Sequence, residues 1–154
     1  MSEAEQNRQS IARLAQQDTM QTSEANLRLL IKYAPTCLAM FDCDMNYVAL
    51  SQRWVEVYQL ESVEAVVGRS HYEIFPQMSD RWKQAHQRGL AGEIQQCDED
   101  SFTLSDGSLQ WLRWEICPWY TEGGESGGII IFVEDITERK RTEVAQRQSE
   151  ERYR

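Results

Sequence analysis

Apolar residues recur at two different spacings along the chain, and these spacings separate expected helices from expected strands. A stripe at helical spacing lies near the N-terminus and consists of Leu27, Leu30, Ile31 and Ala34. Thr22-Ser23-Glu24 offers a capping residue and an acidic first turn, so a helix is predicted to begin there and to end before Pro35. Residues 1–22 are polar and are expected to form a solvent-exposed or frayed linker helix.

The next segments alternate between strand and helix signals. Residues 37–42 and 46–51 are short strand candidates on either side of a tight turn. Ser51 is placed to cap a following helix, on which Trp54 and Tyr58 share one face.

Turn and helix signals then crowd together over residues 66–92. Gly68 breaks the chain, and Ser70 and Glu73 have the spacing of a capping box over one helical turn, which Pro76 closes. A longer helix is predicted at 80–92. Its expected inward residues are Trp82, Ala85, His86 and Gly89.

Three strands are predicted at the end of the domain, over residues 96–104, 109–120 and 129–135. Ser105-Asp106-Gly107-Ser108 has the Asp-Gly signal of a hairpin turn, and residues 121–128 form a glycine-rich loop. Two strands, then helices, then three strands predict an α+β fold with an antiparallel sheet.

The last predicted strand stops abruptly at Glu134-Asp135, where a charged helix follows without a loop. The carboxylate of Asp135 is expected to accept hydrogen bonds from the amides of Thr137 and Glu138, while Glu138 reaches back to the amide of Asp135. Such a capped junction is stiff, so displacement of the strand would reach the helix.

Composition narrows the function classes. The formal net charge of −9 argues against nucleic acid or an anionic membrane as a partner. No apolar run approaches the ~20 residues of a membrane span, so the chain is expected to be cytoplasmic, with any membrane anchor outside it. The four cysteines form no C-x-x-C pair and are expected to be buried free thiols rather than zinc ligands.

Several of these segments together resemble the PAS domain, a sensor module of bacterial signalling proteins. The resemblance spans about residues 23–141 and rests on Val67-Gly68-Arg69-Ser70 with Pro76, on Asp106-Gly107, and on Asp135-Ile136-Thr137. It implies a five-stranded antiparallel sheet with helices on one face, plus flanking N- and C-terminal helices. The expected domain is 23–136, and 137–154 is expected to be a signalling linker helix.

The resemblance also assigns roles to two junction residues. Asp135 and Thr137 would tie the sheet to the flanking helix and transmit the signal; the alternative is that they only cap that helix. A second PAS module is expected after the chain, because Ser149 to Arg154 repeats the pattern of Ser23 to Arg28. Chance similarity of two Glu/Arg-rich segments is the alternative.

No catalytic set is visible in the sequence, so this fragment is not expected to be an enzyme. It has no phosphate-binding G-x-x-x-x-G-K-[ST], no G-x-S-x-G and no kinase histidine box. The stretch near 70–76 lacks the cysteine of flavin-adduct light sensors, which makes such an adduct unexpected. Haem needs an axial histidine, for which His86 is the better candidate and His71 the weaker one.

Side-chain alternation predicts which strand residues face a ligand pocket. The purely apolar strand faces are assigned to the helix side, and seven pocket residues are expected: Trp54, Tyr58, Trp82, His86, Leu112, Trp114 and Ile131. The opposite face of the sheet carries more aromatic surface than soluble proteins normally leave exposed to solvent. A homodimer is therefore expected through Leu27, Leu30, Ile31, Trp111, Trp119 and Phe132, unless the N-terminal helix of the same chain covers that face.

The sequence favours a sensory and dimerisation PAS domain that binds a small ligand or none. The expected parent is a sensor histidine kinase of a two-component phosphorelay, with a diguanylate cyclase or phosphodiesterase next. The alternatives are a haem-dependent gas or redox sensor and a ligand-free spacer.

Overall fold

The computed structural model describes residues 2–104 and 106–153, of which residues 19–21 are described by their backbone alone. Five strands form one antiparallel sheet in the order β2-β1-β5-β4-β3. The strands are β1 (Cys37–Asp42), β2 (Tyr47–Leu50), β3 (Gln95–Thr103), β4 (Leu109–Tyr120) and β5 (Ser126–Asp135). The predicted α+β class and the antiparallel five-stranded sheet are confirmed.

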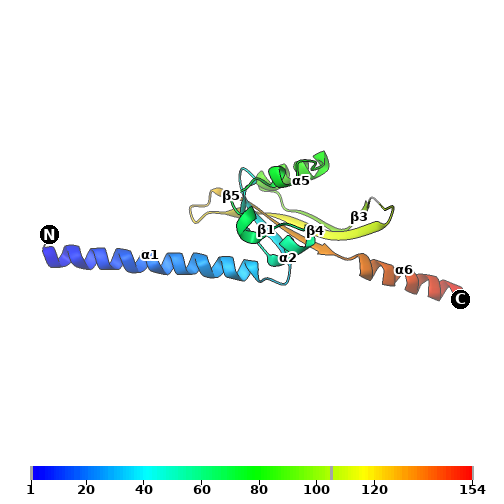
Figure 1. Cartoon of the computed structure of the whole chain (residues 1–154), viewed down its shortest axis with the longest axis horizontal. Coiled ribbons are helices and arrows are strands. Elements are labelled where there is room, and N and C mark those ends of the chain that lie inside the picture. Colours follow the sequence, from blue (N-terminus) through cyan, green and yellow to red (C-terminus); the bar gives the residue numbers. More distant parts are fainter. Residues whose placement is uncertain (1, 105, 154) are drawn as a thin grey trace.

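Four helices lie between β2 and β3 in the chain and two flank the domain. They are α1 (Glu3–Lys32), α2 (Gln52–Val57), α3 (Val63–Val66), α4 (His71–Ile74), α5 (Asp80–Leu90) and α6 (Thr137–Arg152). Helix α5 packs over β3, β4 and β5, and α2 over β1. Figure 1 shows α1 and α6 projecting from the domain in opposite directions.

The N-terminal helix is one continuous element, which corrects the predicted start at residues 22–24. Ser2 caps it by accepting a hydrogen bond from the Glu5 amide at 3.3 Å. Good helix formers before residue 22, mainly Glu, Gln, Arg and Ala, extend the helix through Thr22 and Ser23, which an exposed helix tolerates in its interior. The helix ends just before Pro35, as predicted, and the described side chains before residue 31 are solvent-exposed.

Serine side chains cap the short helices. Ser51 accepts from the Trp54 amide, Ser70 from the Tyr72 amide and Ser62 from the Ala65 amide. The cap at Ser62 begins α3, which the sequence analysis missed because four residues carry no periodicity. The predicted capping box is only half present, since the Glu73 carboxylate binds Arg69 at 3.0 Å rather than the Ser70 amide.

The core lies between the sheet and the helices. The inner sheet face is almost completely buried, with Ala39, Phe41, Ile116 and Ile129 each 0% exposed. Gly89 of α5 faces this layer, where an added Cβ would lie 2.7 Å from the side chain of Ile116. The predicted inward face of α5 is therefore confirmed.

Two turns depend on local backbone chemistry. Met45 adopts φ 62° in the β1–β2 turn, where the Asp42 carboxylate accepts hydrogen bonds from the amides of Asp44 and Asn46. In the β3–β4 turn Gly107 has φ 84°, and Ser108 donates to Asp106; Ser105, which completes the predicted turn, lies outside the described residues.

The two edges of the sheet are irregular. Edge strand β2 has only four residues, and β3 carries a bulge between Cys97 and Asp100 within the acidic run Asp98-Glu99-Asp100. Pro118 sits in β4 beyond the last residue that pairs with β3, so its missing N–H breaks no ladder on that side.

All four cysteines are free, but only Cys37 is buried, which corrects the expectation for Cys43, Cys97 and Cys117. Cys43 is exposed because it occupies the β1–β2 turn. No helix within residues 2–104 and 106–153 is long and apolar enough to cross a membrane.

Candidate functional site

A cavity of about 300 Å³ lies between the sheet and the helices, and it is called the inner cavity below. Its volume is at the lower end of the range for small-molecule sites. The lining residues are Trp54, Tyr58, His71, Phe75, Met78, Trp82, His86, Phe102, Gln110, Leu112, Ile131 and Val133. None of them is an acidic or basic side chain other than histidine, so the cavity is aromatic and uncharged.

Two buried histidines face each other at this cavity. His71 begins α4 and is 4% exposed, while His86 lies on α5 and is 2% exposed. Their ring centroids are 5.4 Å apart. The Nδ1 atom of His71 bonds to the hydroxyl of Tyr47 at 2.7 Å, and Nδ1 of His86 to the hydroxyl of Tyr72 at 2.9 Å.

Burial keeps both imidazoles neutral. It lowers the pKa of His71 to about 3, with a further contribution from nearby His86, and it lowers the pKa of His86 to about 4. Because a charged imidazole has no paired anion here, protonation would leave an uncompensated charge in the core. The site therefore presents two neutral polar rings at neutral pH.

The structure gathers six of the seven predicted pocket residues around the inner cavity. Trp114 is the exception: its indole donates to Asp100 at 2.8 Å and packs edge-on against Trp82 at 5.1 Å. Val133 also lines the cavity, on the apolar strand face that the sequence assigns to the helix side. Five further lining residues were not predicted for the pocket: His71, Phe75, Met78, Phe102 and Gln110. The predicted helix cap at Ser70 was one signal for His71, because the residue after a cap is the first residue of the helix.

One buried polar atom in this region has no hydrogen-bond partner among the described residues. It is Nε1 of Trp54. Trp54 itself packs against Tyr58 with ring centroids 4.7 Å apart, so the predicted shared face of these two residues is present.

The junction between β5 and α6 is fixed to strand β4 at Trp111. The Trp111 amide donates to Oγ1 of Thr137 at 2.9 Å, and the same hydroxyl donates back to the Trp111 carbonyl at 3.4 Å. The Ile136 amide donates to that carbonyl at 2.9 Å, and the Ile136 side chain is 2% exposed. The start of α6 is thus held to the sheet through one residue of β4.

Asp135 occupies a different place in this junction from the one predicted. Ile136, not Asp135, is the capping residue of α6, and no side chain caps that helix. The Asp135 carboxylate does accept from the Thr137 amide at 2.9 Å, and it also accepts from Gln110 Nε2 at 3.2 Å. Among the described residues, the predicted bonds that involve Glu138 are not found, because Ile136 separates strand from helix and shifts the first helical turn by one residue.

The hydrogen bonds of Asp135 favour its ionised form. Partial burial alone would raise the pKa of this carboxyl, but the donors on Thr137 and Gln110 outweigh that effect and lower the pKa below its ordinary value. The carboxylate is therefore charged at neutral pH and keeps both donors bound.

Lys140 adds a further contact between α6 and the sheet. Its Nζ lies 5.0 Å from the ring centroid of Trp111 and binds Glu99 of β3 at 3.0 Å and Glu143 at 3.3 Å. Its side chain is only 13% exposed. The aromatic outer surface of Trp111 is thus partly covered by the first turns of α6.

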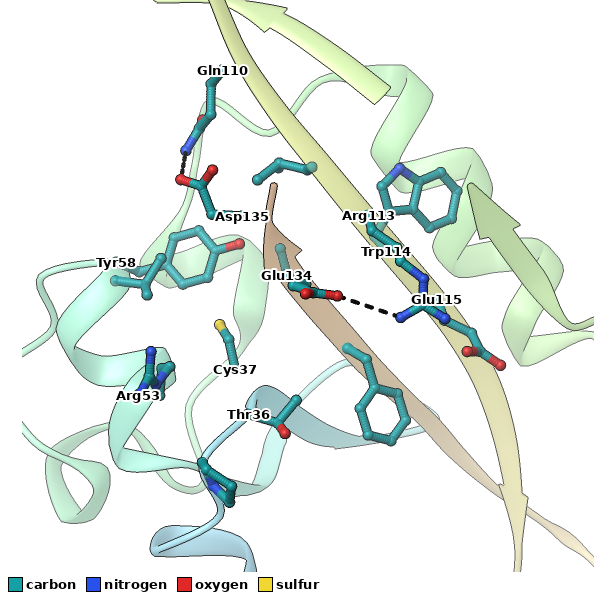
Figure 2. A pocket seen from close by; sticks show the side chains of 15 residues that line it. Thr36, Cys37, Arg53, Tyr58, Gln110, Arg113, Trp114, Glu115, Glu134 and Asp135 are labelled. Carbon is teal, nitrogen blue, oxygen red and sulfur yellow. Dashed lines mark hydrogen bonds and ion pairs between the residues drawn. The ribbon is translucent and has the colours of Figure 1, made fainter. Parts of the chain in front are cut away.

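A second, larger hollow of about 870 Å³ lies beside the junction and is called the junction groove below. Figure 2 shows Asp135 with its bond from Gln110, and Glu134 paired with Arg113 at 3.6 Å. Cys37 also lines it; burial raises the pKa of its thiol to about 12, so the thiol stays protonated. The groove and the inner cavity share four lining residues, Tyr58, Gln110, Leu112 and Val133.

The residues predicted for a dimer interface lie on exposed or half-buried surface. In the single chain α1 contacts β2, and Leu27 and Leu30 are 59% and 69% exposed, so these leucines do not seal the outer aromatic face. Trp111, Trp119 and Phe132 are half-buried on that face, and Ile31 is half-buried at the end of α1.

The inner cavity can be compared with what metal or haem binding would need. Within the described residues, no group of three or more His, Cys, Asp or Glu is placed to hold a metal ion. A haem iron would take Nε2 of His71 or His86, since Nδ1 of each is bound to tyrosine. A cavity of about 300 Å³ fits a small ligand better than a porphyrin ring system.

Comparison with known proteins bears on this architecture. A family model described as the PAS fold matches residues 32–141. No curated protein matches the chain at a significant level.

Several solved structures share the fold. The PAS domain of BvgS from Bordetella pertussis is 19% identical, with a TM-score of 0.62 over 84% of this chain and 98% of that one. A sensory box sensor histidine kinase from Vibrio cholerae is 20% identical, with a TM-score of 0.52 over 79% of this chain and 98% of that one.

VqmA from Vibrio cholerae, solved as a complex with ligand and DNA, is 21% identical, with a TM-score of 0.58 over 73% of this chain and 51% of VqmA. The chain spans between 51% and 57% of the length of the VqmA chains that it matches. At these identities the likenesses show a common fold.

Proposed function

The chain belongs to the PAS family, whose domains are sensory modules, and we propose that it binds a small uncharged ligand in the inner cavity and signals through the Asp135-Ile136-Thr137 junction to α6. The single observation that carries this proposal is the arrangement of residues 110–112 of β4. Gln110 and Leu112 line the inner cavity, whereas Trp111 between them holds Ile136 and Thr137.

This arrangement couples the cavity to the helix by covalent geometry. Adjacent strand residues point to opposite faces, so a ligand that displaces the backbone at Leu112 or Gln110 also moves the Trp111 backbone between them. That backbone forms the hydrogen bonds that position α6, and Gln110 additionally donates to Asp135. Ligand occupancy would thus bias the orientation of the first turn of α6.

The output activity of such a sensor depends on the domain that follows the junction in a multidomain protein. We favour a cytoplasmic position in a sensor histidine kinase of a two-component phosphorelay, with a diguanylate cyclase or phosphodiesterase as the next choice. The likeness to a sensor histidine kinase from Vibrio cholerae supports this choice. VqmA is solved with DNA, but the net charge of −9 on this chain argues against a nucleic-acid surface here.

PAS domains commonly form dimers, and we extend this property to the chain. The exposed leucines of α1 and the half-buried aromatic residues of the outer sheet face supply apolar surface that a second copy would cover. In a parallel dimer the two α6 helices would lie side by side, so a change in the orientation of each would alter the contact between them.

The ligand-binding part of the proposal is tested by filling the cavity. Leu112→Trp places an indole in the inner cavity, and Leu109→Trp, which is 50% exposed on the same strand, is the matched control. Small uncharged fragments at about 1 mM should raise the melting temperature of the wild-type chain and of Leu109→Trp, but not that of Leu112→Trp. Stabilisation of all three proteins alike, or of none, contradicts a ligand site in the inner cavity and favours a spacer.

Haem binding is the second candidate function, since Nε2 of both histidines is free of protein partners among the described residues. The purified chain, mixed with an equivalent of haem, would show a Soret band shifted from that of free haem, and His86→Phe or His71→Phe would abolish the shift. An unshifted spectrum leaves the small-ligand function in place.

A further inference from the structure

The polar groups at the inner cavity define what kind of ligand it accepts, an inference that rests on the proposed ligand-binding function. Besides the Tyr58 hydroxyl and the Gln110 amide, His71 and His86 supply these groups, and Nδ1 of each is already bound by a tyrosine hydroxyl. Nε2 of each has no protein partner in the described part of the chain. Nε2 of each histidine is accessible from the cavity, whereas Nε1 of Trp54, which also lacks a partner there, is fully buried.

The tyrosine partners set which ring nitrogen carries the proton. The hydroxyl hydrogens of Tyr47 and Tyr72 need acceptors, and the imidazole Nδ1 atoms are the acceptors that the described structure offers them. A phenol that donates to Nδ1 leaves the proton of a neutral imidazole on Nε2. Both histidines therefore present an N–H donor to the cavity, and neither presents an acceptor.

The inner cavity also disfavours charged ligands. The lining contains no Asp, Glu, Lys or Arg, so a buried ionic ligand would lose its hydration without gaining an ion pair. Burial also lowers the pKa of both imidazoles, so they supply no positive charge to an anion at neutral pH.

The walls select the shape of the ligand. Aromatic rings come from α2, from the segment after α4, from α5 and from β3, and they belong to Trp54, Tyr58, Phe75, Trp82 and Phe102. Trp82 and Phe102 already stack at 5.9 Å with an interplanar angle of 19°. Flat rings bind to such walls by stacking or edge-on packing.

We propose that the inner cavity binds an uncharged, planar aromatic molecule whose edge carries hydrogen-bond acceptors, which the Nε2–H groups of His71 and His86 bind. Carbonyl oxygens and unprotonated ring nitrogens are acceptors of this kind. Carboxylates, ammonium or amidinium groups and plain hydrocarbons of the same shape bind less well.

Four isosteric probes test this selection: 2-naphthamide, 2-naphthoate, 2-naphthamidinium and 2-isopropenylnaphthalene. They keep the ring system and differ in charge and in acceptors. Titrations of the ¹⁵N-labelled chain, followed by NMR, should give a dissociation constant for 2-naphthamide about tenfold lower than for 2-isopropenylnaphthalene. The two ionic probes should bind about a hundredfold more weakly than 2-naphthamide.

The NMR signals of the imidazoles give a measurement that needs no variant. Both rings should be neutral with the proton on Nε2 at pH 7, and 2-naphthamide should shift at least one Nε2–H resonance. A proton on Nδ1 in both rings overturns the proposal, because the cavity would then present acceptors.

Substitution of the two histidines tests whether they cause the preference for ligands with hydrogen-bond acceptors. His71→Phe and His86→Phe keep an aromatic ring but remove the donor, so the preference for 2-naphthamide over 2-isopropenylnaphthalene should shrink while binding of the hydrocarbon persists. Trp119→Phe, on the outer sheet face, should leave the preference unchanged.

The outcomes separate this inference from the proposed function. If the hydrocarbon or an ionic probe binds as well as 2-naphthamide, the ligand class is wrong while the cavity remains a ligand site. If no probe binds to the wild-type chain, both the ligand class and the proposed ligand-binding function are wrong.

Discussion

The two flanking helices leave the same sheet but are attached to it very differently. Helix α6 begins on β4, where Ile136 is buried, Thr137 exchanges hydrogen bonds with Trp111 and Lys140 covers the Trp111 ring. Helix α1 ends at Lys32, and the exposed residues Pro35 and Thr36 link it to β1. Its side-chain contact with the domain is the ion pair between Lys32 and Glu64 at 2.9 Å, in which the Glu64 side chain is 70% exposed.

The difference teaches where movement can be transmitted. A surface ion pair contributes little free energy and permits reorientation, so α1 is free to settle against another surface. The contacts of α6 include one buried side chain and three hydrogen bonds to a single residue, so α6 must follow the sheet. Four variants test this comparison, from the largest expected effect on the free energy of unfolding to the smallest.

Ile136→Ala should have the largest effect, because Ile136 is 2% exposed at the start of α6. Loss of a buried isoleucine side chain costs about 2–5 kcal/mol, which urea denaturation would measure. Val144→Ala, which is 49% exposed on the same helix, should change the value by about 0.5 kcal/mol or less. Equal effects of the two substitutions would mean that α6 is not anchored at Ile136.

Thr137→Val should come next, since it keeps the shape of the side chain but removes the hydroxyl that pairs with Trp111. The Trp111 amide loses its acceptor, at a cost of about 1–3 kcal/mol. Hydrogen exchange at that amide should accelerate more than exchange elsewhere in β4. Thr142→Val serves as the control, because its hydroxyl donates only to the Glu138 carbonyl on exposed helix surface.

Asp135→Ala should be milder, at about 0.5–1.5 kcal/mol, because it removes two hydrogen bonds at an exposed position. Since folding lowers the pKa of Asp135, its contribution is present above the ordinary carboxyl pKa and is lost as pH falls below it. The difference between wild type and variant should therefore vanish in acid.

In the signalling protein proposed above, Asp135→Ala should change signal-dependent output far more than melting temperature. Glu134→Ala, its neighbour on the exposed strand end, is the matched control. Unchanged output combined with a lowered melting temperature would make Asp135 a structural residue only.

Leu30→Glu with Ile31→Glu should have the smallest effect on the free energy of unfolding of the monomer, about 0.5 kcal/mol, since Leu30 is 69% exposed and Ile31 is only half-buried. The same change puts two charges into the proposed dimer contact, so sedimentation should show monomer where the wild type forms dimer. Gln16→Glu with Gln17→Glu adds the same charge to the same helix and should leave the dimer intact. Identical sedimentation of all three proteins would rule out this interface.

Most of the fold was predictable from the sequence because strand alternation and turn residues act locally. The strand beginning at Leu109 and the turn at Gly107 follow from such signals. The start of α1 was mispredicted because Ser23 has the chemistry of a cap, and only the helix-forming residues upstream decide against that reading.

The candidate site was less predictable, since it depends on how layers pack. Alternation correctly puts Leu112 and Trp114 on one face, but it does not say how far along that face the cavity extends. The Trp114 indole instead donates to Asp100 at the bulge in β3 and is not part of the cavity lining, and no local sequence pattern predicts that bond. His71 and Gln110 reach the cavity through the placement of α4 and β4, which is tertiary information.

The bulged, acidic edge strand β3 has a consequence for self-assembly. An open sheet edge is a template for another strand, and long, flat, apolar edges are where aggregation begins. Here the bulge and the charges of Asp98 and Glu99 make the β3 edge unsuitable for pairing with another strand, and the β2 edge offers only four residues for pairing. Both edges therefore disfavour edge-to-edge pairing of copies of this domain into open ribbons.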